Sequence, residues 1–489
     1  MDFMVSRTSI TDLNRGCVES SLMGINEVGS GLLQTGIVPA PLLALVVGTV
    51  IVILLLAWLD VPAFLGLIIA AFAVGLVAPQ VALGNVPTRI AEAFGENMVG
   101  IGIPILMAAI IGKSMTDSGA AQRIVRGFES LTGRDRAEYS LFGSSFVIAI
   151  PVFFDNVLYL LTPLARTAAA RMEDNYTLYL IAVAGAGVVT HGFVPPTPGP
   201  LAAADQLSAN LGTTIVVGLM VGLPTAALVS IGFGKWINSR MDIPLRDSMG
   251  MTTDELETMS TMSTDRLPGI VESLLPIVIA VGFIGANTTA SNIFGVGGQL
   301  GAVMSFVGDV NFSLTLAAVV AAITFYRESS LDRTDWGEEL TQALQSGGNI
   351  AAITAAGGAF GAMLAAAGIG EYIAGILSGF GLGILVTAWV IATAVRIVQG
   401  SATVAILTTA GIVAPLAGGF EPNAAYLVMA IGAGATTFSW YNDSGFWIIK
   451  ELGGLTQVET LKTWSVATTL VSVFGFAFTV LFSTFLPLS

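Results

Sequence analysis

The chain carries very little charge for its length. Only 11% of its 489 residues are Asp, Glu, Lys or Arg, whereas soluble proteins have about 25%. Hydrophobic residues make up 54% of it, and many apolar runs approach the roughly 20 residues that a membrane-spanning helix needs. None of them shows the alternation over about ten residues that is typical of an outer-membrane barrel. The composition predicts an all-α polytopic membrane protein.

Several other residue types are scarce. The single cysteine, Cys17, excludes an internal disulfide framework and a Cys-rich metal site, and the single histidine, His191, excludes His-cluster metal or haem chemistry. Basic residues are outnumbered by acidic ones, 19 to 33, which argues against nucleic acid as a partner. We therefore expect no metal, no cofactor and no nucleic-acid partner. Residues 1–37 lack the order of a signal peptide and are expected to form a disordered or interfacial tail.

The apolar runs divide the chain into two halves. Membrane repeat 1 covers 38–234, a polar cytoplasmic linker covers 235–268, and membrane repeat 2 covers 269–489. The predicted spans of the first half are 38–58, 61–80, 98–116, 176–198 and 212–234. Those of the second half are 269–287, 311–327, 349–367, 423–440 and 463–487.

Two further apolar stretches contain polar breaks. Residues 138–165 have Pro151 and Asp155 near the middle, and residues 383–418 have Gly400 there. A re-entrant hairpin, which enters the membrane, breaks and returns by the same face, explains both stretches. Irregular backbone at membrane depth survives only where protein or a cavity covers it. A single kinked span is the alternative for each stretch.

Basic residues orient the two hairpins in opposite directions. Cytoplasmic loops collect Lys and Arg. The segments beside the second hairpin contain only Glu371 and Glu421, whereas the first hairpin is flanked by Arg123, Arg126, Arg134, Arg136, Arg166 and Arg171. The first hairpin therefore opens to the cytoplasm and the second to the outside, with 288–308 as an interfacial segment. The prediction is an inverted repeat of two five-span halves, each with a re-entrant hairpin and a broken helix, and both termini lie outside.

Four breaks are candidates for a transport site, because half-helix ends at membrane depth present N–H groups to anions and carbonyl groups to cations. The first break, AIPVFFDNV, contains Asp155 and Asn156. A carboxylate inside a membrane is costly unless it is paired, binds a cation or is protonated. Asp155 is therefore a candidate carrier of a coupled proton, and the alternative is a cap of the returning half-helix.

The second break, THGFVPPTPGP, has four prolines within residues 195–200, and we expect an extended tip because proline does not continue a helix. Thr197 offers a hydroxyl group there. His191 is a candidate to pass a proton or contact substrate, although a lone histidine is more often only a satisfied hydrogen-bonding group.

The third break is VRIVQGSATV, and the fourth is SWYNDSGFW. Arg396 requires a partner, which is a substrate carboxylate, Asp155 or Asp443. Ser401 and Thr403 open a half-helix whose hydroxyl and N–H groups suit an anion, or else bond back to helical carbonyl groups. The fourth break adds further candidates, which are Asn442 and the second buried carboxylate, Asp443.

The stretches THGFVPPTPGP, VRIVQGSATV and YNDSGFWIIKE, in this order and with PVFFD before them, resemble the gluconate permease family of proton symporters. The likeness covers roughly residues 38–489. The resemblance implies the inverted repeats of the ion transporter superfamily, a possible homodimer, and import of sugar acids with a proton. The family commonly reads PPHPGP where this chain has Thr197, a departure that could alter the substrate or the coupling ion.

We therefore expect a multi-pass inner-membrane protein that imports gluconate or a related sugar acid with a proton, and not an enzyme. Ser401, Thr403 and nearby N–H groups are expected to hold the substrate carboxylate, with Arg396 as counter-charge. Hydroxyl contacts are expected from four side chains, namely Asn156, His191, Thr197 and Asn442. Asp155, with Asp443 second, is expected to carry the proton.

Three alternatives remain open. A sodium-driven carboxylate carrier would use carbonyl groups at the breaks and Asp443 as ion ligands. An intramembrane hydrolase would pair Ser401 with His191, but no acid in the sequence is placed to orient that histidine. A receptor that transports nothing would need a soluble signalling domain, for which the chain has no room.

Overall fold

The computed structural model describes residues 39–59, 61–172, 175–241, 243–246, 267–292, 298–369, 372, 383–420, 422–440 and 443–488. The described residues contain helices and no strand, as predicted. The tail 1–37, most of the linker and Asn442 lie outside them. Within the first half the helices are α2 (Ala40–Ile53), α3 (Ala63–Val77), α4 (Val86–Asp117), α5 (Ala120–Thr132), α6 (Ala137–Ile148), α7 (Phe154–Met172), α8 (Tyr176–Phe193), α9 (Pro198–Gln206), α10 (Leu211–Ala226) and α11 (Gly234–Asn238). Those of the second half are α13 (Ile270–Asn292), α14 (Gly298–Val307), α15 (Val310–Glu328), α16 (Arg333–Ala366), α18 (Ile384–Gln399), α19 (Ala402–Val413), α20 (Ala425–Ala435), α21 (Ser444–Gly453), α22 (Gln457–Thr460) and α23 (Val466–Phe485).

Seven helices among the described residues are long and apolar enough to cross a membrane. They contain seven of the ten predicted spans. The other three predicted spans correspond to the shorter apolar helices α2, α3 and α20. Helix α20 ends at Ala435, before the predicted end of this span at residue 440. The prediction of a membrane protein with many helical spans is confirmed.

Both predicted hairpin stretches are interrupted helices. Helices α6 and α7 are separated by residues 149–153, and α18 and α19 are separated by Gly400 and Ser401. Gly400 has φ of +88°, a left-handed conformation that glycine adopts without steric cost and that ends α18. Helices α18 and α19 pack against each other, as the arms of a hairpin do.

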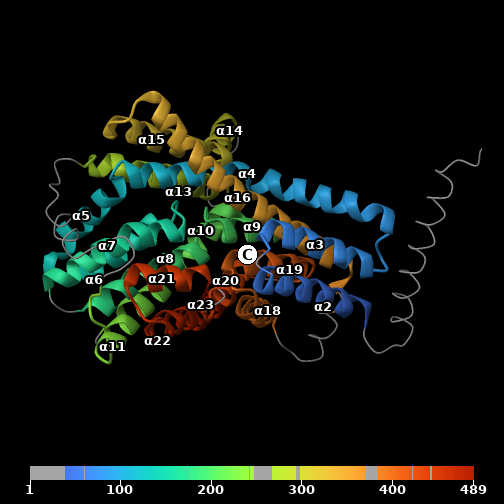
Figure 1. The fold of residues 1–489 in the computed structure, drawn as a ribbon. Helices are drawn as coiled ribbons and strands as arrows, with labels where there is room; N and C mark the ends of the chain where they lie inside the picture. The colour runs from blue at the N-terminus through green and yellow to red at the C-terminus, as the bar shows by residue number, and fades with distance from the viewer. Residues whose placement is uncertain are drawn as a thin grey trace, which may run out of the picture.

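Helices of the first half pack against helices of the second half. Helix α4 packs along α16, whereas α8 contacts α20 and α10 contacts α23 over shorter stretches. The short helices next to the breaks also pack across the two halves. Helix α9 of the first half packs on α19 of the second, and α21 of the second half packs on α7 of the first. Figure 1 shows α4 running along one side of the molecule, with α2, α3 and α19 toward one end and α5, α6 and α7 at the other.

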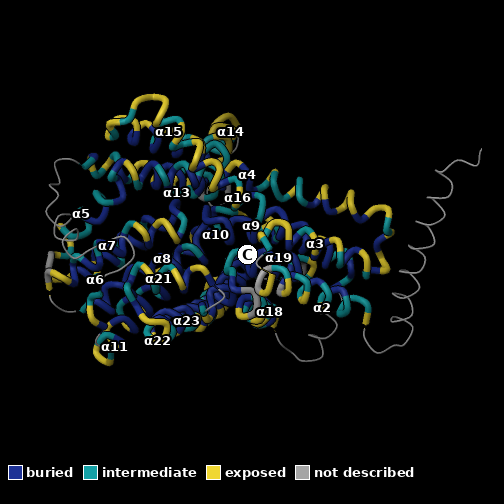
Figure 2. Tube along the Cα trace, in the orientation of Figure 1, coloured by how far each residue is buried: buried dark blue, intermediate teal, exposed yellow. Residues whose placement is uncertain are grey.

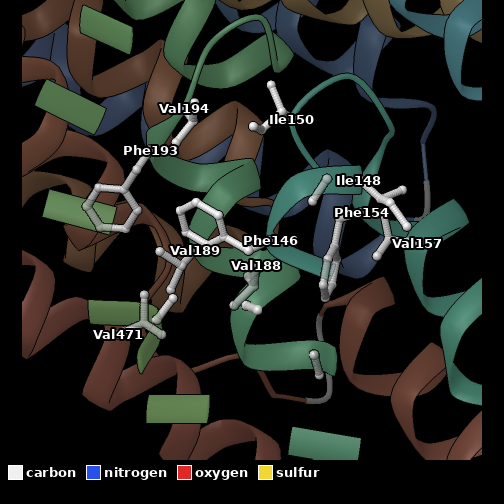
Figure 3. Close-up of a cluster of buried hydrophobic side chains, with 14 of the residues drawn as sticks. Phe146, Ile148, Ile150, Phe154, Val157, Val188, Val189, Phe193, Val194 and Val471 are labelled. Atoms are coloured by element: carbon white, nitrogen blue, oxygen red, sulfur yellow. The ribbon is translucent and has the colours of Figure 1, made fainter. Parts of the chain in front are cut away.

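Helices α8 and α20 form the centre. All eleven residues of α20 and seventeen of the eighteen residues of α8 are buried, and Figure 2 shows the buried residues concentrated in the interior. The two helices cross at Gly192 and Gly432, where a Cβ atom on Gly432 would overlap the carbonyl oxygen of Gly192. Figure 3 shows the apolar cluster beside the first two breaks, with Phe146, Phe154 and Phe193 among its members.

The predicted interfacial segment 288–308 is partly described. Helix α13 extends through its beginning to Asn292, and α14 forms its end. Helix α14 has no buried residue, so it lies on the outside of the fold. The amphipathic α5 was not predicted, because its charged residues interrupt the apolar pattern that marks a span.

Candidate functional site

All four breaks contribute residues to the lining of a single cavity. It has a volume of about 440 Å³, which lies in the range of small-molecule sites. Its apolar wall includes Val61, Ala63, Phe153, Val188 and Ile350. Its polar and charged lining residues are Asp155, His191, Arg396, Ser401, Thr403, Asp443 and Ser444. Six of the nine residues that the sequence analysis selected therefore meet at one place.

The first break contributes Asp155, which lies in the first turn of α7 and faces the cavity. Asp155 has no hydrogen-bond or ion-pair partner among the described residues. Asp155 and the neighbouring Asn156 are both exposed, but Asn156 is not among the lining residues. The two residues, although adjacent in the sequence, are therefore placed differently.

The second break is shorter than predicted. An extended tip was expected through residue 200, but α9 begins at Pro198, so that expectation was wrong for its second part. Proline fits the first helical turn because its missing N–H group would have no partner there. The Thr197 hydroxyl donates to the Val194 carbonyl group at 2.7 Å and is buried, so Thr197 is not among the lining residues.

His191, in the last turn of α8, reaches the cavity from its wall. Its ring lies 6.2 Å from the ring of Phe154, and Phe154 in turn stacks on Trp464 at 5.7 Å. The His191 Nδ1 atom is buried and has no hydrogen-bond partner in the described part of the chain. The imidazole therefore keeps one nitrogen available for another group.

The third break presents the N-terminus of α19 to the cavity. Ser401 is the N-cap residue, and its hydroxyl oxygen accepts from the Val404 N–H group at 3.4 Å. Ala402 and Thr403 form the first turn and line the cavity. Backbone N–H groups at this position have no helical acceptor, so the helix end favours an anion.

The fourth break pairs with the third through an ion pair. Arg396 Nη2 donates to Asp443 Oδ2 at 2.5 Å, and both side chains are nearly buried. Asp443 is the N-cap residue of α21, and its Oδ1 atom accepts from the Gly445 N–H group at 3.1 Å. The Arg396 Nε and Nη1 atoms are buried and have no hydrogen-bond partner among the described residues.

Sequence analysis missed three residues of this site. Phe154 and Trp464 line the cavity, and Ser439 hydrogen-bonds to the carboxylate of Asp443. Trp464 lies in an apolar run that resembles any other span, so no signal in the sequence marks it. Ser439 stands within the fourth break, where its proximity to Asp443 was a usable signal.

Packed helices of spanning length, interrupted at polar breaks that enclose one cavity, define a membrane transport protein. A gluconate permease from Bacillus licheniformis is 32% identical over 449 residues, which cover 91% of this chain and 100% of that protein. The Gnt-II system L-idonate transporter of Escherichia coli is 31% identical over 435 residues, covering 89% of this chain and 97% of the transporter.

Among solved structures, the Alcanivorax borkumensis YdaH transporter has a TM-score of 0.60 at 11% identity, covering 88% of this chain and 99% of that one. That likeness concerns the fold alone. The model of the GntP family permeases matches residues 40–485. The chain belongs to the GntP permease family, so the resemblance seen in the motifs is confirmed. It is a multi-span membrane permease and not an enzyme, so the alternative of an intramembrane hydrolase is excluded.

Proposed function

We propose that the protein imports gluconate or a related sugar acid together with a proton, by alternating access. The observation that carries the proposal is the buried guanidinium of Arg396, a residue of the cavity lining, two of whose nitrogens have no hydrogen-bond partner among the described residues. A buried cation with unused donors suits a carboxylate, which can accept two charge-assisted hydrogen bonds. Relatives named as gluconate and L-idonate transporters support a sugar acid as the substrate.

The substrate carboxylate would lie between Arg396 and the N-terminus of α19. The Ser401 and Thr403 hydroxyl groups and the first N–H groups of that helix complete its binding. The Nδ1 atom of His191, which has no hydrogen-bond partner among the described residues, would meet a substrate hydroxyl group. Asn442, outside the described residues, stays a proposed hydroxyl contact.

Two of the proposed hydroxyl contacts have weaker support. The Thr197 hydroxyl is engaged by the Val194 carbonyl group, and Asn156 is not among the lining residues. The side chain of either residue would have to move to contact a substrate in this cavity. We retain them as positions that the alternate state of the transporter would expose.

Charge balance in the cavity supports a proton as the coupling ion. The ion pair of Arg396 with Asp443 is neutral, so Asp155 gives the cavity one uncompensated negative charge. An anionic substrate placed beside it would be repelled, because like charges at close range destabilise each other. Protonation of Asp155 removes the repulsion, so proton and substrate would bind together. Asp443 is less suited to carry the proton because three donors already hold it.

Alternating access would follow from the inverted repeat, 38–234 against 269–489, each half with five spans, a re-entrant hairpin and a broken helix. The pairing of α4 with α16, α8 with α20 and α10 with α23 supports such a repeat. Inversion of the two halves would allow the same cavity to open to either side of the membrane.

The test of the substrate class is competition for uptake of labelled gluconate into proteoliposomes. We expect gluconate and idonate to compete, and neutral gluconamide to compete at least about tenfold more weakly, because it cannot form the charge-assisted bonds to Arg396. Equal competition by gluconamide, or preferred competition by a dicarboxylate, would contradict the proposed site.

A further inference from the structure

Ser439 stands at the centre of a directed chain of hydrogen bonds that ends at the site. The Trp464 indole Nε1 atom donates to the Ser439 Oγ atom at 2.7 Å, and the Ser439 hydroxyl donates to Asp443 Oδ2. Ser439 and Trp464 are both almost completely buried. An indole N–H group is only a donor, so the serine hydroxyl must accept from it and direct its own proton toward Asp443.

The backbone around Ser439 is also held in a fixed conformation. Phe438 has φ of +36°, a left-handed conformation that is uncommon for a bulky residue. The next residue, Ser439, accepts at its carbonyl group a hydrogen bond from Ser465. Trp464 and Ser465 both belong to the π-helical segment Leu461–Ser465, a kind of wide turn that is frequent at functional sites. One distorted turn thus fixes both the side chain and the backbone of Ser439.

The chain determines how Asp443 meets Arg396. The Gly445 N–H group holds Asp443 Oδ1, and Ser439 and Arg396 Nη2 share Oδ2. With both oxygens committed in this way, the carboxylate contacts one nitrogen of the guanidinium and leaves the other two. A carboxylate free to turn would present both oxygens to Arg396, because the bidentate arrangement is the stronger one.

We propose that Ser439, oriented by Trp464, is a positioning residue that prevents Asp443 from covering the guanidinium and so keeps Arg396 available to the substrate. The inference rests on the proposed function, in which Arg396 receives the substrate carboxylate. Ser439 itself is not among the residues that line the cavity. Its effect on the substrate would therefore pass through Asp443.

The decisive measurement is the ratio of inhibition constants for gluconamide and gluconate, determined by competition against labelled gluconate in proteoliposomes. Ser439→Ala and Trp464→Phe are each expected to raise KM for gluconate about tenfold, the order of one hydrogen bond to a charged group. Both variants should lower the ratio of the gluconamide to the gluconate inhibition constant by a similar factor. The value of kcat should change less than KM. Trp464→Phe retains a ring that can stack on Phe154. Ser439→Thr retains the hydroxyl group and should therefore show the same ratio as the unaltered protein.

The chain offers a matched control. Trp389 donates from its indole N–H group to the buried Ser472 hydroxyl at 2.9 Å and stacks on Phe476, away from the lining residues. Trp389→Phe therefore removes the same kind of hydrogen bond without touching Asp443. We expect this control to leave the ratio unchanged. A control that shifts the ratio as far as Trp464→Phe does would overturn the inference.

A second background separates positioning from general damage. In Asp443→Asn, which has no carboxylate to turn onto Arg396, adding Ser439→Ala should change the ratio no further. An additional tenfold loss in that background would overturn the inference. If the unaltered protein already fails to prefer gluconate over gluconamide, the proposed function fails. If the unaltered protein prefers gluconate and both variants retain that preference, only the positioning role fails.

Discussion

Removing either member of the ion pair between Arg396 and Asp443 should cost far more stability than removing both. The side chains are only 5% and 12% exposed, so solvent screens the remaining charge poorly. Loss of one partner from a buried pair costs about 3–5 kcal/mol, because an uncompensated charge stays in the interior. Replacement of a whole pair by neutral residues is often close to neutral.

The hydrogen bonds around the pair give the two single variants an order. In Arg396→Met, Asp443 keeps its donors from Ser439 and from the Gly445 N–H group, so we expect the lower end, about 3 kcal/mol. In Asp443→Asn, Arg396 loses its only ion-pair partner among the described residues, so we expect the upper end of this range, about 5 kcal/mol. The double variant, Arg396→Met with Asp443→Asn, should be more stable than either single variant.

Substrate binding should follow a different order from stability. Arg396→Met loses two charge-assisted hydrogen bonds to the substrate, which together correspond to a loss of affinity of at least about 100-fold. Asp443→Asn keeps the guanidinium and should retain binding. The assays are chemical unfolding of the purified protein in detergent and equilibrium binding of labelled gluconate. Additive destabilisation in the double variant, or equal loss of binding in both single variants, would refute this reasoning.

Three further predictions concern residues outside the ion pair. Thr197→Val should lower stability by about 1 kcal/mol in unfolding measurements, because it removes the hydrogen bond to the Val194 carbonyl group; unchanged unfolding would contradict this. Gly432→Ala should destabilise the protein by about 1–3 kcal/mol in unfolding measurements, since its Cβ atom would overlap the Gly192 carbonyl oxygen, whereas Gly232→Ala, with open space around it, is the control. Arg166→Met should destabilise by a similar amount, because it leaves two partly buried backbone carbonyl groups without this donor; unchanged unfolding would show that those contacts contribute nothing.

The sequence predicted the helical spans and the positions of the breaks because both depend on local composition. Pro151, Gly400 and the prolines from Pro195 onward interrupt apolar runs, and the structure interrupts its helices at or next to them. Six of the selected side chains also proved to share one cavity. Buried polar groups in a membrane protein have few tolerable locations, so residue type alone carried much of that prediction.

The other features of the site could not be predicted, because they depend on contacts between residues far apart in the sequence. Nothing local distinguishes Thr197, whose hydroxyl is used by the backbone, from Thr403, which faces the cavity. Trp464 reaches Ser439 across 25 residues of sequence. The choice of Asp443 over Asp155 as the partner of Arg396 required the relative placement of three helices.

The central claim is that protonation of Asp155 admits the anionic substrate to the cavity. Its most direct test is uptake of labelled gluconate into proteoliposomes with a proton gradient or a sodium gradient imposed separately, for the unaltered protein and for Asp155→Asn. We predict accumulation driven by the proton gradient and not by sodium in the unaltered protein. Asp155→Asn should abolish that accumulation and still exchange gluconate across the membrane, because its neutral side chain mimics the protonated state. Accumulation driven by sodium alone, or proton-driven accumulation that survives in Asp155→Asn, would contradict the account.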